Sequence, residues 1–154
     1  MASVESRLEA IGLQLPTPAA PAANYVPYVI AGTMLFVAGQ IPFYNGQRLH
    51  IARLGQDYTV EQGQDAAKVC ALNILAQAKA AVNGDWSRIK RCVKLGGFVN
   101  CTPDFDQHPA VINGASEVMV AALGDAGKHA RFAVGAPNLP FGVAVEIDAI
   151  FEIA

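Results

Sequence analysis

Two charged residues in the C-terminal quarter of the sequence stand where they could take part in chemistry. Arg131 opens the apolar segment 130–136, and Glu146 lies between Val145 and Ile147. An arginine guanidinium can bind a carboxylate through two parallel hydrogen bonds, and a nearby carboxylate can orient a water molecule or accept a proton. Alternatively, the two side chains pair with each other or with a neighbouring acid, because an unpaired buried charge is costly. The pattern by itself favours the structural interpretation.

Other catalytic signatures are absent from the sequence. It has no GxSxG, Walker or HExxH motif, and no GxGxxG follows a predicted strand. The histidines and cysteines are His50, His108, His129, Cys70, Cys92 and Cys101. The histidines are too scattered for a set of metal ligands, and no cysteine pair has CxxC spacing. We therefore expect neither a metal nor a cofactor.

Composition points to one domain that associates with copies of itself. The chain has 154 residues, of which 53% are hydrophobic and only 16% are charged, against roughly 25% charged in an average globular chain. This length is typical of a single domain, and we expect residues 1–154 to form one. The shortage of charge predicts that part of the surface is covered by another subunit.

Charge and hydropathy also limit the partners and the cellular location that we expect for this protein. The net charge is −2, and the basic run 88–94 alternates with apolar residues like the solvated face of a strand, so we expect no nucleic acid partner. The N-terminus lacks the pattern of a secretory signal. No apolar run approaches the length of a membrane span. The reduced cytoplasm is therefore the expected location.

The first third of the chain is predicted to hold a helix, an extended arm and two strands. Residues 3–12 have helical periodicity, and the three prolines of segment 15–23 make it an extended arm. Segments 25–31 and 34–40 are rich in strand-forming residues and are joined by a two-residue turn. Pro27 predicts that the first strand lies at an edge or begins late. The longer, irregular segment 43–58 is predicted to contain a short strand around 49–54.

The remaining chain alternates helices and strands. Thr59 and Gln62 form a capping-box pattern ahead of a helix that ends near Gly84, and Pro109 suits the first turn of a second helix. Between them, residues 89–101 read as a strand, in which Gly96-Gly97 marks a bulge or a close backbone approach. The segments 130–136 and 143–153 are predicted to form a closing hairpin. In the last segment alternate residues are uniformly apolar, which fits a sheet face covered by helices. The order predicts an α+β fold with a mixed sheet and two helices on one face.

Several short segments resemble the signature of one known family. Ala130-Arg131-Phe132-Ala133-Val134, Leu139-Pro140 and the run from Val143 to Ile150 are similar to the closing segment of the Rid family. This is the family of reactive intermediate imine deaminases, also called YjgF-like or L-PSP endoribonucleases. Ala38-Gly39-Gln40-Ile41-Pro42 and Pro27-Tyr28-Val29 resemble two earlier family segments, and Asn113 falls on a family asparagine. The matches run in the family's order from about residue 24 to the end.

The resemblance implies a chorismate-mutase-like α+β fold and a homotrimer with clefts between subunits. Active members hydrolyse enamines or imines of amino acids, such as 2-aminoacrylate, to 2-keto acids and ammonia without a cofactor. By this resemblance Arg131 binds the substrate carboxylate and Glu146 positions the attacking water. Gly39 offers a backbone N–H, and Tyr28 and Asn113 line the cleft.

The sequence also departs from the family pattern. Ala38 replaces a usual serine, and Ala133 stands where many members carry a cysteine. The longer 43–58 segment and the N-terminal helix resemble a longer YjgF/chorismate-mutase-like subgroup that carries the endoribonuclease label. The alternatives to a deaminase are therefore a trimer that binds a small carboxylate without turnover and an RNA-cleaving enzyme. The acidic pI of about 5.8 counts against the latter.

Overall fold

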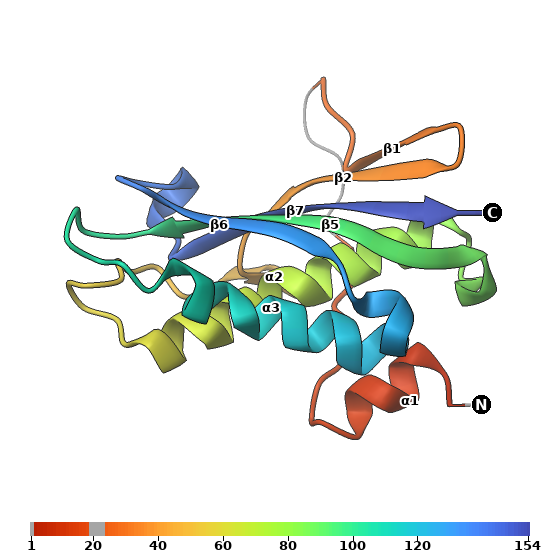
Figure 1. The fold of residues 1–154 in the computed structure, drawn as a ribbon, viewed down its shortest axis with the longest axis horizontal. Helices are drawn as coiled ribbons and strands as arrows, with labels where there is room; N and C mark the ends of the chain where they lie inside the picture. The colour runs from red at the N-terminus through yellow and green to blue at the C-terminus, as the bar shows by residue number, and fades with distance from the viewer. Residues whose placement is uncertain (1, 19–23) are drawn as a thin grey trace.

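The computed structural model describes residues 2–18 and 24–154, and its centre is a five-stranded mixed sheet with the order β1-β2-β7-β5-β6 (Figure 1). The strands are β1 (Tyr28–Ala31), β2 (Met34–Gln40), β5 (Ile89–Asn100), β6 (Ala130–Ala136) and β7 (Val145–Ile153). Among the neighbouring strand pairs of this sheet, β5 and β6 are parallel and the other three pairs are antiparallel. Two long helices, α2 (Val60–Ala81) and α3 (His108–Leu123), lie side by side against one face of the sheet (Figure 1). The predicted α+β fold with two helices on one face is therefore confirmed.

The two long helices begin where the local sequence predicts. Thr59 Oγ1 accepts the Gln62 N–H at 3.2 Å, and Gln62 Oε1 accepts the Thr59 N–H at 2.9 Å, so the capping box forms. Pro109 lies in the first turn of α3, where a missing N–H removes no helical hydrogen bond. A side chain at Gly114 would collide with the backbone of Gln64. Glycine at this position therefore lets α2 and α3 pack closely.

The first two strands form the predicted hairpin, and β1 begins late. Ala31 pairs with Met34, so the turn has two residues, and its Gly32 has a φ of 61°. This is the left-handed region that glycine adopts without strain. β1 starts at Tyr28, directly after Pro27, because proline has no N–H to donate to the ladder.

The predicted closing hairpin is wrong, because β5 lies between β6 and β7. The connection after β6 crosses the end of β5 instead of turning back beside it. Asn100, the last residue of β5, holds this crossing in place: its N–H donates to Ala144 O at 2.9 Å and its Nδ2 donates to Val143 O at 3.1 Å. β7 then pairs on both sides, with β2 and with β5. Its inward residues are buried as the alternation predicted.

The short strand predicted around residues 49–54 is also wrong in position. The segment forms a small hairpin earlier, from β3 (Phe43–Tyr44) and β4 (Gln47–Arg48). Its turn residues Asn45 and Gly46 have φ values of 48° and 90°, and Asn-Gly is the strongest short-range signal for such a turn. Residues 49–54 contribute only isolated bridges at Ile51 and Leu54.

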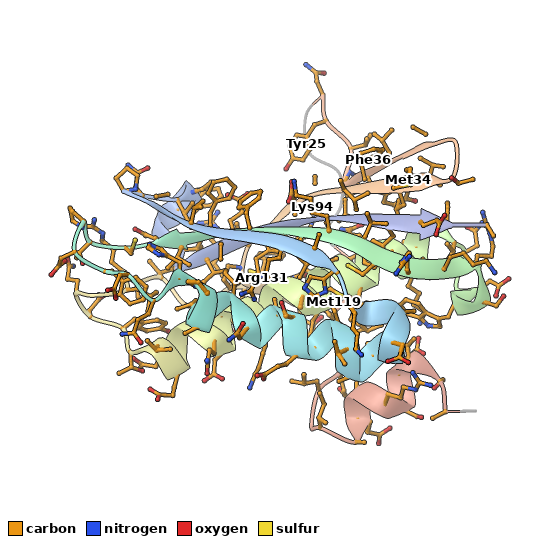
Figure 2. All side chains as sticks on the ribbon, viewed as in Figure 1. Tyr25, Met34, Phe36, Lys94, Met119 and Arg131 are labelled. Carbon is orange, nitrogen blue, oxygen red and sulfur yellow. The ribbon has the colours of Figure 1, made fainter. Side chains whose placement is uncertain are left out.

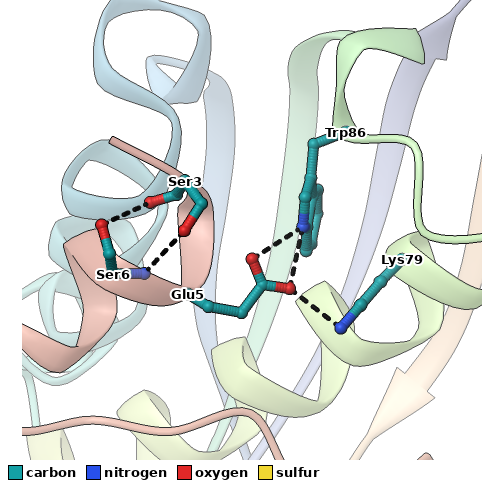
Figure 3. Close-up of polar contacts among 5 residues, drawn as sticks. All are labelled: Ser3, Glu5, Ser6, Lys79 and Trp86. Carbon is teal, nitrogen blue, oxygen red and sulfur yellow. Dashed lines mark hydrogen bonds and ion pairs between the residues drawn. The ribbon is translucent and has the colours of Figure 1, made fainter. Parts of the chain in front are cut away.

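The N-terminal helix α1 (Val4–Glu9) is shorter than the predicted 3–12. Its Glu5 connects it to α2 and to Trp86. Glu5 accepts a hydrogen bond from Trp86 Nε1 at 3.0 Å and pairs with Lys79 Nζ at 2.9 Å (Figure 3). Ser3 caps the helix by accepting the Ser6 N–H at 3.1 Å (Figure 3). Part of the predicted arm, residues 19–23, lies outside the described residues. Among the helices that the structure describes, none is long and apolar enough to cross a membrane.

The sheet face opposite the helices is uncovered in the single chain. Met34, Phe36 and Lys94 lie on this side in Figure 2, whereas Arg131 points toward α3. Phe36 is 44% exposed and Phe98 is 38% exposed. Large apolar side chains at the centre of an exposed sheet face fit the expectation of a covering partner.

Candidate functional site

The sheet register fixes which predicted site residues share a face. One row across all five strands contains Tyr28, Val37, Ala149, Leu95 and Arg131. Side chains of paired residues point to the same face, and the middle three are buried against the helices. Arg131 and Tyr28 are therefore on the helix side, at opposite edges of the sheet. Four strand spacings of about 4.8 Å separate their backbones by roughly 19 Å.

The guanidinium of Arg131 is held by α3. Its Nη1 donates to Asn113 Oδ1 at 2.9 Å and to Ser116 Oγ at 3.1 Å, and its Nη2 donates weakly to Pro109 O at 3.5 Å. The predicted pair Arg131 and Asn113 is thus brought together. None of the ion pairs formed among the described residues involves Arg131, so no carboxylate in the described part of the chain neutralises its positive charge.

Ser116 and His129 extend this network, and sequence reasoning missed both. Arg131 can only donate, so Ser116 Oγ accepts from it and is left to donate its own hydrogen to His129 Nε2 at 2.9 Å. His129 then carries its proton on Nδ1 and donates it to Gly127 O at 2.6 Å. Two features of the sequence could have indicated them. Ser116 follows Asn113 by three residues, which places both on one face of a helix, and His129 precedes Arg131 by two residues, which is the spacing of side chains on one face of a strand.

Glu146 lies on the other face of the sheet. It pairs in register with Phe98, whose side chain belongs to the uncovered face. A Cβ built on Gly39 would lie 2.5 Å from Glu146 Oε2, so the predicted residues Gly39 and Glu146 are neighbours. Partial burial raises the pKa of the Glu146 carboxyl, and the charge of Asp148 raises it further. A carboxyl with a raised pKa is better suited to accept a proton near neutral pH.

The predicted residues therefore fall into separate groups within one chain. Arg131 and Asn113 are at the β6 edge, and Glu146 and Gly39 are on the opposite face. Tyr28 is at the far edge, partly buried against the core. The predicted pairing of Arg131 with Glu146 across a hairpin does not occur, because β5 lies between their strands.

The chemistry available at the Arg131 group is carboxylate binding. A guanidinium has five N–H donors, and three are engaged by Asn113, Ser116 and Pro109. Two donors remain, one on Nε and one on Nη2, which is the number that a bidentate carboxylate needs. Within the described parts of the chain, no group of three or more histidine, cysteine or acidic residues is placed to hold a metal ion.

The comparisons with known proteins assign this fold to a family of small α+β proteins. Residues 5–152 match the family described as "YjgF/chorismate mutase-like, putative endoribonuclease". The chain belongs to this YjgF/Rid family. The predicted resemblance is thereby confirmed.

Relatives resemble the chain over nearly its whole length. The Trypanosoma cruzi protein TCP17 is 46% identical over 97% of this chain and 94% of its own. The crystal structure of Atu1372 from Agrobacterium tumefaciens, a protein of unknown function, is 49% identical with a TM-score of 0.92, covering 98% of this chain and 94% of that one. RidA from a Psychrobacter species is 27% identical with a TM-score of 0.61, over 89% and 94%. E. coli TdcF, at 22% identity and a TM-score of 0.62 over 100% of both chains, shares the fold alone.

Proposed function

We propose that the protein hydrolyses small enamines or imines derived from amino acids, such as 2-aminoacrylate, to 2-keto acids and ammonia. The observation that carries this proposal is the Arg131 guanidinium, which is oriented by α3 and keeps two donors and its charge for a ligand carboxylate. The structure of TdcF was solved with bound serine, a small amino acid whose carboxylate is the group that Arg131 is suited to bind.

The proposed active site is assembled from two copies of the chain. Arg131 and Glu146 lie on opposite faces of one sheet, so a single chain cannot present both to the same small molecule. A homotrimer would place the β6 edge of one subunit beside Glu146, Gly39 and Tyr28 of the next. The uncovered apolar face around Phe36 and Phe98 supports such an assembly.

The proposed reaction needs only orientation and proton transfer. An imine carbon is already electrophilic, so a water molecule held by Glu146 adds to it while the carboxylate accepts a proton from that water. Glu146 then gives this proton to nitrogen, which completes a carbinolamine. In the second step the carboxylate takes the hydroxyl proton as the C=O double bond forms, the C–N bond breaks with its electron pair on nitrogen, and nitrogen receives that proton, so ammonia leaves the keto acid. All three cysteines are free thiols, which fits action in the reduced cytoplasm.

The test is a coupled assay in which 2-aminoacrylate is generated in solution and pyruvate release is followed. The wild type is expected to accelerate release, and Arg131→Ala is expected to abolish the acceleration. Arg48→Ala is the matched control, because Arg48 is exposed, lies on the small β3–β4 hairpin outside the five-stranded sheet, and forms no ion pair with a described residue. Elution of the wild type as a 16.2 kDa monomer at micromolar concentration would contradict the two-subunit site.

The same experiment separates the deaminase from a carboxylate-binding regulator. Ala38 and Ala133 stand where a hydroxyl and a thiol were expected from the family pattern, and this departure favours the regulator as the second candidate. Binding of serine or pyruvate that requires Arg131, measured by calorimetry without any acceleration of pyruvate release, would establish binding and refute catalysis.

A further inference from the structure

A cavity lies at the C-terminal end of β6. It has a volume of about 330 Å³ and is formed by the loop after β5, the first turn of α3 and the last residues of β6. Its size is within the roughly 300–1,000 Å³ of small-molecule sites. Gly135 lines it, four residues beyond Arg131, which corresponds to about 13 Å along a strand. Arg131, Asn113 and Ser116 are not among its lining residues, although His108 in its wall is next in sequence to Pro109, whose carbonyl accepts from Arg131 Nη2.

A thiol and an imidazole meet at the wall of this cavity. Cys101 Sγ lies 3.4 Å from His108 Nε2, and Phe105 packs edge-on against the His108 ring with a centroid distance of 5.4 Å. A Cβ on Gly135 would lie 2.8 Å from both Sγ and Nε2. The absence of a side chain at this position therefore leaves the space over the two reactive atoms open.

An arginine without a charge partner lines the same cavity. Arg53 Nη2 donates to Cys101 O at 3.0 Å, which fixes the guanidinium beside the thiol. Its Nε is buried and has no hydrogen-bond partner, so the donors left for a ligand in the cavity are those on Nη1 and Nη2. Arg53 forms no ion pair with any described residue. A fixed cation with unused donors on an otherwise mostly apolar cavity is suited to bind a small anion.

The surroundings of Cys101 favour the neutral thiol before it reacts. Burial raises the pKa of Cys101, and the Arg53 charge opposes that rise. A neutral thiol can donate its S–H to His108 Nε2, and the imidazole is then positioned to take the proton when sulfur reacts. The other cysteines, Cys70 and Cys92, have no exposed surface and line no part of this cavity.

We propose that this cavity binds a small α,β-unsaturated carboxylate, with Arg53 holding the carboxylate and Cys101 adding to the β-carbon. The sulfur lone pair forms the S–C bond, and the electron pair of the C=C double bond moves to the α-carbon. The thiol proton passes to His108 Nε2 and then to the α-carbon. The adduct contains all the atoms of both reactants, and no oxidant or reductant is needed.

The experiment compares iodoacetate with iodoacetamide on the full-length protein. Iodoacetate carries both the carboxylate that Arg53 would bind and an electrophilic carbon for Cys101, whereas iodoacetamide carries only the electrophilic carbon. With either reagent an S–C bond forms, the C–I bond breaks and iodide leaves. Labelling of each cysteine is followed by peptide mass spectrometry, with Cys70 and Cys92 as internal controls. We expect the iodoacetate-to-iodoacetamide rate ratio of Cys101 to exceed that of free cysteine at least tenfold.

Variants assign the effect to individual residues. Arg53→Met is expected to return the ratio to that of free cysteine, whereas the exposed control Arg48→Met should leave it unchanged. His108→Asn is expected to slow labelling by both reagents. If Arg53→Met does not fold, the wild-type ratio still decides. A Cys101 ratio equal to that of free cysteine, or a Cys101 labelled no faster than Cys70 and Cys92, overturns the proposal.

Discussion

Replacing Arg131 by lysine tests the donor count on which the proposed active site depends. A lysine ammonium keeps the positive charge but has three N–H donors, whereas the guanidinium has five. Asn113, Ser116 and Pro109 together accept three hydrogen bonds at this position. A lysine that satisfied all of them would have none left for a substrate carboxylate, and a lysine that turned to the substrate would leave Asn113 and Ser116 without their donor.

The magnitude follows from the two hydrogen bonds that are lost. Charge-assisted bonds contribute about 1.5–3 kcal/mol each, and about 1.4 kcal/mol corresponds to a tenfold change in rate. Even at the lower end, Arg131→Lys is expected to lower kcat/KM for 2-aminoacrylate about a hundredfold, close to the loss in Arg131→Ala. The assay is pyruvate release, with Arg48→Lys as the matched control. A value for Arg131→Lys within threefold of the wild type would refute the reasoning, because charge alone would then suffice.

Three further outcomes are expected. Ser116→Ala should lower kcat/KM roughly tenfold, about the effect of one lost hydrogen bond, with an unchanged melting temperature; an unaltered kcat/KM would count against a positioning role for Ser116 toward Arg131. Glu146→Gln should abolish turnover yet raise the melting temperature at neutral pH. The pKa of Glu146 is higher in the folded than in the unfolded protein, so the protonated carboxyl favours folding. This contribution to stability is complete below the unfolded-state pKa and is lost as pH rises through the folded-state pKa. This gain in melting temperature should vanish at about pH 4, near the unfolded-state pKa of a glutamate. A gain of equal size at that pH would contradict the raised pKa of Glu146. Gly97→Ala should destabilise by about 1–3 kcal/mol, seen as a lower urea midpoint, because its Cβ would lie 2.8 Å from Ile112.

The sequence predicted elements well where the signal is local. The capping box at Thr59 and Gln62 and the prolines Pro27 and Pro109 act within one turn or one residue pair, so the boundaries they set do not depend on the rest of the fold. Asn45-Gly46 is an equally local signal that sequence reasoning overlooked, and a single short strand was consequently expected around 49–54 where the structure forms the β3–β4 hairpin earlier.

Strand partners were not predictable in this way. The spacing of the last two strands favours a hairpin, yet β5 lies between them, and Asn100 at the end of β5 donates hydrogen bonds to the connecting loop. Which strand lies beside which depends on contacts between residues far apart in sequence. This error also affected the site, since Arg131 and Glu146 were expected on neighbouring strands.

The sequence by itself determined the α+β class, the two helices on one face and the family. Sequence context singled out Arg131 and Glu146, and the family resemblance added Asn113. Only the tertiary structure showed that α3 orients Arg131, that Ser116 and His129 support it, and that Glu146 is on the opposite face. The physical reason is that periodicity and capping depend on near neighbours, whereas the direction of a side chain relative to a distant one depends on strand order and register.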